Sequence, residues 1–161
     1  MLNWVSGFRI LFMNALKIIK EVFTMFHDGA ICGYTGDSAK LTLKIECLYL
    51  AERINPEFDS FFVELLNVET LYFVTWHSEE NPSEKITGVQ KIFEPELEII
   101  SAEIVGNIVE VHCRQDNKQF AYSGGVLHLS CGVIKVLDQD GKEITMDSLI
   151  SLCKQYWDNL R

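Results

Sequence analysis

The stretch LTLKIECLY, residues 41–49, decides the fold class, because its hydrophobic side chains recur at every second position. Successive side chains of a β-strand point to opposite faces of the sheet. Leu43 and Ile45 therefore lie on one face, and Lys44 and Glu46 lie on the other. The alternation predicts a strand with one buried face.

Further segments share the apolar, aromatic and β-branched composition that is typical of strands. FFVELLNVETLYFVTW predicts two strands, at about 61–66 and 70–76, separated near Asn67. SGGVLHLSCGVIKVL predicts two more short strands. The pair Gly106-Asn107 predicts a two-residue hairpin turn, because glycine adopts the positive φ that the first turn position needs.

Pro95 lacks the N–H group that a central strand donates, so it predicts an edge strand or an irregular lead-in. The strand phases predict a buried core that includes Leu43, Ile45, Phe73, Leu127 and Leu129. These features together indicate one mainly β domain, built as an antiparallel sandwich or a rolled sheet.

Both ends of the chain return to helical spacing. Hydrophobic residues in 1–26 fall on one side at 100° per residue, which predicts an amphipathic helix. The C-terminal helix has Thr145 or Asp147 as its cap. Its predicted apolar stripe consists of Leu149, Leu152, Cys153, Tyr156 and Leu160.

The N-terminal helix allows three interpretations. Residues 1–24 dock on the domain, lie on a membrane surface, or are translated from a misassigned start upstream of Met25. The charge-free run Ile10 to Leu16 is too short to span a bilayer, so we expect no integral membrane segment. We divide the chain into a helical extension, 1–24, and a β-rich domain, 25–161, and expect the extension to be dispensable for folding.

Charge and cysteine content exclude several classes of function. The net charge is −9, and residues 1–26 contribute +2 of it, so the remaining body is acidic and repels phosphate backbones. We therefore expect no direct nucleic-acid binding. The five cysteines are odd in number and scattered without a C-x-x-C pair, which indicates neither a disulfide framework nor a zinc ribbon. Free thiols favour a cytoplasmic location.

The doublet His27-Asp28 is the strongest candidate for metal chemistry, since adjacent His and Asp bind metals in helical HD phosphohydrolases. Here the doublet precedes strands, which favours a structural turn instead. The strand phases of His112 and His128 predict that both face solvent or the sheet rim rather than a common pocket. With no nucleophile, base and orienting group together, we expect a non-enzyme with no catalytic residue, metal ligand or cofactor.

Acidic side chains concentrate in one part of the chain. They are Glu79, Glu80, Glu84, Glu94, Glu96 and Glu98. The last three are spaced by two, so an extended backbone presents them on one face. They form either a charged edge that prevents sheet aggregation or, with Trp76 as an anchor, the binding site for a basic protein.

Residues 25–160 resemble the small β-rich immunity proteins of bacterial polymorphic toxin systems. The resemblance rests on FHDG before the first strand, FFVELLNVETLYFVTW, SGGVLHLSCGVIKVLD and the terminal YWDNL. It implies a protein that binds and neutralises a cognate toxin without catalysis.

A second hypothesis is a small-ligand-binding β domain, or an enzyme of unknown type. Its pocket would be lined by Trp76, Tyr72, Tyr122 and His128. Large aromatic side chains at strand spacing also occur as ordinary core residues, so the sequence leaves both hypotheses open.

Overall fold

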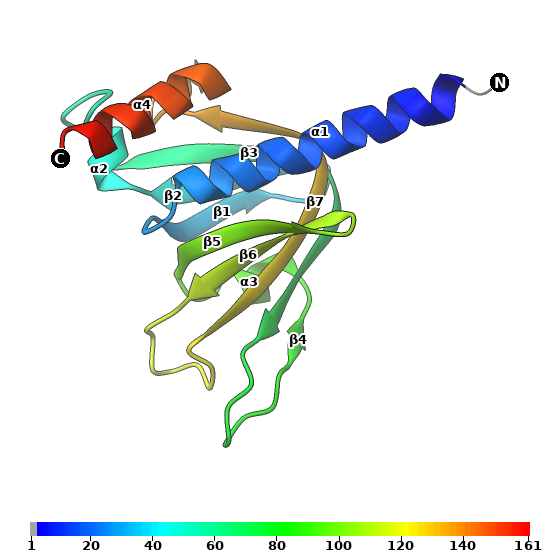
Figure 1. The fold of residues 1–161 in the computed structure, drawn as a ribbon. Helices are drawn as coiled ribbons and strands as arrows, with labels where there is room; N and C mark the ends of the chain where they lie inside the picture. Colours follow the sequence, from blue (N-terminus) through cyan, green and yellow to red (C-terminus); the bar gives the residue numbers. More distant parts are fainter. Residues whose placement is uncertain (1–2) are drawn as a thin grey trace.

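The computed structural model describes residues 3–161, and the side chains of Leu11 and residues 13–161. The protein is mainly antiparallel β-sheet with a helix at each end, as the sequence predicts (Figure 1). The strands are β1 (Ala30–Gly36), β2 (Lys40–Glu46), β3 (Ser60–Thr75), β4 (Lys85–Ile86), β5 (Leu97–Val105), β6 (Ile108–Arg114), β7 (Gly124–Leu137) and β8 (Glu143–Ile144). The helices are α1 (Asn3–Met25), α2 (Leu48–Ala51), α3 (Val89–Ile92) and α4 (Met146–Asp158).

The strands form a rolled sheet rather than a sandwich. Their order is β4-β3-β2-β1-β5-β6-β7-β8, and β3 also pairs with β7, which closes the roll. The register of β3 and β7 runs from Phe62↔Leu137 to Thr75↔Gly125. Each of these long strands has two shorter neighbours on its other side: β2 and β4 beside β3, and β6 and β8 beside β7.

The two long strands correct the sequence prediction, which divided each of them. Asn67 does mark an irregularity, because its φ is 53° and the register with β7 shifts between Val68 and Thr70. Pairing with β2 ends at Leu66, so the edge of β3 changes its neighbour at this point. The pairing with β7 continues past the irregularity and keeps β3 one strand, and the same pairing keeps β7 undivided.

The predicted turn and lead-in are confirmed. Gly106 has φ 61° in the two-residue turn between β5 and β6. Pro95 lies in irregular backbone before β5 begins at Leu97. β5 is not an edge strand, since it pairs with β1 on one side and β6 on the other.

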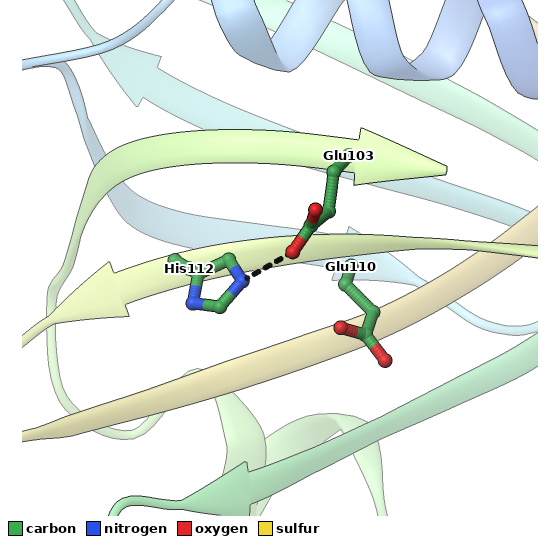
Figure 2. Close-up of side chains that lie close together, drawn as sticks. All are labelled: Glu103, Glu110 and His112. Carbon is green, nitrogen blue, oxygen red and sulfur yellow. Dashed lines mark hydrogen bonds and ion pairs between the residues drawn. The ribbon is translucent and has the colours of Figure 1, made fainter. Parts of the chain in front are cut away.

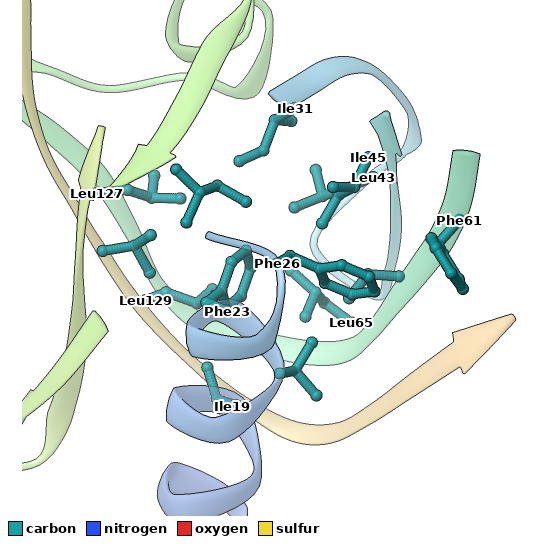
Figure 3. Close-up of a cluster of buried hydrophobic side chains, with 14 of the residues drawn as sticks. Ile19, Phe23, Phe26, Ile31, Leu43, Ile45, Phe61, Leu65, Leu127 and Leu129 are labelled. Carbon is teal, nitrogen blue, oxygen red and sulfur yellow. The ribbon is translucent and has the colours of Figure 1, made fainter. Parts of the chain in front are cut away.

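The core lies inside the roll and includes the C-terminal half of α1. All five core residues predicted from the strands are fully buried. The helix adds Leu16, Ile19, Val22 and Phe23, each with no exposed surface, and Phe26 follows directly after it. Figure 3 shows Phe23 and Phe26 among side chains of the sheet, and the N-terminal part of α1 extends past the strands in Figure 1.

The helix is therefore docked on the domain, which is one of the three interpretations considered. The boundary at residue 24 falls inside α1, and the buried face of the helix belongs to the same core as the strands. Within residues 3–161, no helix has both the length and the apolar character that crossing a membrane requires.

Helix α4 is capped by Thr145 rather than Asp147. The Thr145 side-chain oxygen accepts a hydrogen bond from the Ser148 N–H at 3.2 Å. The predicted stripe holds for Leu149, which is fully buried, but not for Leu160, which lies beyond the end of the helix and is 61% exposed.

Replacing Thr145 with Ala is expected to reduce the free energy of unfolding by about 1 kcal/mol, because a first-turn N–H loses its acceptor. Urea unfolding of the two proteins measures the difference. Lys154→Ala, at an exposed position inside the same helix, is the control and should change stability by less than about 0.5 kcal/mol. Equal effects of the two substitutions would contradict the role of Thr145 as a cap.

Candidate functional site

The doublet His27-Asp28 forms the turn that joins α1 to β1. Asp28 adopts φ 64°, and its backbone N–H donates a hydrogen bond to the carbonyl of Ile99 at 2.9 Å. The Tyr49 hydroxyl donates to the His27 carbonyl at 2.7 Å. These contacts fix the backbone where the chain leaves the helix and enters the sheet.

The side chains of the doublet also make structural contacts. His27 Nδ1 lies 3.2 Å from the Thr24 carbonyl oxygen. The His27 ring stacks on Trp157 of α4 with ring centroids 5.4 Å apart. His27 Nε2 and Asp28 Oδ2 are 3.6 Å apart, and the Asp28 side chain is 70% exposed. The packing supports the interpretation of the doublet as a structural junction.

Three of the predicted acidic residues share one face, as their spacing predicts. Glu94, Glu96 and Glu98 point outward, while the residues between them are buried. They line a groove together with Arg114 and Asp116. Arg114 Nη2 lies 2.7 Å from Glu98 Oε2, and Arg114 Nε lies 3.8 Å from Asp116 Oδ1.

The other predicted binding residues lie in or beside the connection between β3 and β4. Glu79 and Glu80 are exposed there, and Trp76 is 37% exposed. Glu84 is anchored by its backbone, which exchanges hydrogen bonds with Thr75. Glu84 and Glu94 line one hollow, whose walls also carry Lys85 and Lys91.

The structure does not bring the four predicted pocket residues to one site. Tyr72 and His128 stack on the outer face of the sheet, with ring centroids 4.4 Å apart. Tyr122 instead packs on Phe73, which points into the core from the next position of the same strand. Trp76 lies over Gly124, where a Cβ atom would approach the indole ring to 2.5 Å. Tyr72 and Phe73 are neighbouring positions of β3 and therefore face opposite sides of the sheet. Tyr122, which packs on Phe73, is thus separated from Tyr72 and His128.

A mixed cluster that the sequence analysis missed occupies the outer face of the roll. Glu103 of β5 pairs in register with Glu110 of β6, and Glu110 pairs with His128 of β7. His112 lies two residues beyond Glu110 on the same face. Glu103, Glu110 and His112 each offer a ligand atom within 4.8 Å of the others (Figure 2). We call these three residues the Glu–His cluster.

One short contact lies within the cluster, and a second joins Glu110 to His128 beside it. His112 Nε2 lies 3.2 Å from Glu103 Oε1, and His128 Nδ1 lies 3.5 Å from Glu110 Oε1. His128 Nδ1 is buried and has no hydrogen-bond partner among the residues that the structure describes. Burial lowers the pKa of His128, and the nearby carboxylate of Glu110 opposes that shift.

The outward orientation predicted for His112 and His128 is confirmed, because Val109, Val111 and Leu127 on the opposite phases are fully buried. On this outer face both histidines lie beside Glu110, a neighbourhood that the strand phases alone did not predict. The position of His112 beside Glu110 is contained in the pattern of one strand. The positions of Glu103 and His128 depend on cross-strand register, which a single strand pattern does not contain.

No family model, curated protein or solved structure matches this chain.

Proposed function

We propose that the protein is a non-catalytic binding domain that captures a basic protein partner, as an immunity protein captures a toxin. The acidic groove formed by Glu94, Glu96, Glu98 and Asp116 carries the proposal. Four carboxylates line it with one guanidinium, so the groove is negatively charged and suits a cationic surface. The resemblance in sequence points to the same function.

The groove belongs to a larger acidic end of the molecule. The connections β3–β4, α3–β5 and β6–β7 gather at the end of the sheet remote from α2 and α4 (Figure 1). They and the adjoining strand ends carry seven carboxylates and four cations. The carboxylates are Glu79, Glu80, Glu84, Glu94, Glu96, Glu98 and Asp116, and the cations are Lys85, Lys91, Arg114 and Lys118. This excess of negative charge steers a basic partner toward this end.

The strand pairing argues against a purely protective role for the charges. Acidic residues that prevent aggregation lie on unpaired edge strands. Glu98 lies instead in β5 and has registered neighbours on both sides, Ala30 and Arg114. Its position favours recognition over edge protection.

Trp76 supplies the apolar contact that charge alone does not give. Its indole ring is partly exposed beside the acidic end and rests on Gly124. Buried aromatic anchors contribute most of the binding energy in many interfaces, whereas exposed charges act mainly on the association rate.

Changing Glu94, Glu96 and Glu98 together to Gln is expected to slow association with the partner by roughly tenfold and to flatten its salt dependence. The candidate partner is the product of the neighbouring gene, co-expressed and recovered by pull-down. Surface plasmon resonance at two salt concentrations then measures the rates, and growth during co-expression reports neutralisation.

The control changes Glu52 and Glu57 to Gln and Asp158 to Asn, which alters net charge equally at the α2–α4 end. These three residues are exposed, and we expect the control to keep the wild-type association rate. If the neighbouring product is neither toxic nor recovered with the protein, the proposal fails. Equal slowing by both triple variants would assign the effect to net charge rather than to the groove.

A further inference from the structure

We propose that the Glu–His cluster, Glu103, Glu110 and His112, is a binding site for Zn²⁺ on the outer face of the rolled sheet. The proposal concerns an ion rather than a protein and does not depend on the acidic groove.

The spacing of the ligand atoms fits a single ion. In tetrahedral zinc sites, bonds of about 2.0–2.1 Å place neighbouring ligand atoms roughly 3.4 Å apart. Glu103 Oε1 and His112 Nε2 are 3.2 Å apart, and all three ligand atoms lie within 4.8 Å of one another. A small rotation of the carboxylates brings the set onto one ion.

The backbone holds the ligands together, so their proximity does not depend on side-chain rotation alone. Glu103 and Glu110 are direct cross-strand neighbours of the β5–β6 hairpin. Like charges at such positions repel each other and destabilise the sheet. A bound divalent cation converts this repulsion into two attractive contacts.

His128 is a positioning residue for this site. Its Nδ1 atom is buried, lies 3.5 Å from Glu110 Oε1 and has no hydrogen-bond partner among the described residues. Carboxylates that bind metals are themselves commonly held by a neighbouring hydrogen bond. An Nδ1–H group donates that bond when Glu110 turns toward the ion.

The donor set selects zinc over calcium and magnesium. One imidazole nitrogen with two carboxylates suits Zn²⁺, whereas Ca²⁺ and Mg²⁺ prefer oxygen ligands throughout. The Glu103 side chain is 61% exposed, which leaves room for water at the remaining coordination position.

Isothermal titration of the full chain with zinc chloride tests the proposal. We expect one Zn²⁺ per chain, and at least tenfold weaker binding in Glu110→Gln and in His112→Ala. His128→Ala should weaken binding by about 10–100-fold, as loss of an outer hydrogen bond does at other metal sites. Glu57→Gln, outside both the cluster and the groove, should bind as the wild type does, and calcium chloride should give no binding in the same range.

Thermal unfolding with EDTA checks that the variants fold. Glu110→Gln should melt at or above the wild-type temperature without metal, because it removes a like-charge pair, and zinc should no longer raise that temperature. Absorption spectra of the protein with Co²⁺ in place of Zn²⁺ test for binding through the free thiols of Cys32 or Cys153. Spectra without a thiolate-to-cobalt charge-transfer band exclude such binding. No zinc uptake, or equal uptake by wild type and Glu110→Gln, would overturn the proposal.

Discussion

Removal of residues 1–24 is expected to abolish cooperative folding. The deletion takes away Leu16, Ile19, Val22 and Phe23, which have no exposed surface in the intact protein. It also uncovers the inward side chains of the strands on which α1 packs, among them Leu127 and Leu129 (Figure 3).

The expected loss is comparable to the whole stability of a domain. Burial of one large aliphatic or aromatic side chain contributes about 1.5–3 kcal/mol, so four contribute roughly 6–12 kcal/mol. The free energy of unfolding of a whole domain is about 5–15 kcal/mol. The burial of these side chains leads us to expect the opposite of the dispensability predicted from the sequence, and the deletion decides between the two.

Urea unfolding followed by circular dichroism measures the effect. Phe23→Ala is the milder variant, expected to cost about 3–5 kcal/mol because it leaves a cavity between helix and sheet. Glu21→Ala, at an exposed position of the same helix, is its control and should remain within about 0.5 kcal/mol of wild type. A truncated protein that unfolds cooperatively at the wild-type midpoint would show that the helix does not contribute to the stability of the domain.

Ile45→Asp is expected to destabilise the protein by several kcal/mol, or to prevent its folding. Ile45 has no exposed surface and pairs with Ile31 on one side and Phe61 on the other. A carboxylate at this position loses its hydration and finds apolar neighbours. The thermal midpoint and the soluble yield measure the loss.

Lys44→Asp is the matched control, since it introduces the same residue on the exposed face of the same strand. Its effect is expected to stay below about 1 kcal/mol, because the charge remains in water. An Ile45→Asp protein that melts at the wild-type temperature would show that the strand phase is wrong.

The acidic groove could be predicted in part from the sequence. The period of two in Glu94, Glu96 and Glu98 is local, and it gave their common face correctly. Arg114 and Asp116 come from a different strand and its following loop, so their presence in the groove depends on the pairing of β5 with β6.

The Glu–His cluster likewise combines features that local sequence predicts with features that depend on strand pairing. The outward direction of His112 and His128 follows from strand alternation. The same alternation places His112 beside Glu110, whereas the positions of Glu103 and His128 beside Glu110 follow from the registers of two strand pairs. A shift of one residue in either register would turn one side of the cluster toward the core.

The sequence by itself determined the local features of this protein: the strand phases, the Gly106-Asn107 turn, the helical ends and the excess of negative charge. The charge follows from composition, and each of the other features depends on residues that are close in the chain, where side-chain periodicity and turn geometry act directly. Tertiary structure alone decided that β3 and β7 are continuous and that α1 belongs to the core. These features depend on backbone pairing and apolar burial between segments far apart in the chain, and such contacts form only when the whole sheet closes around the helix.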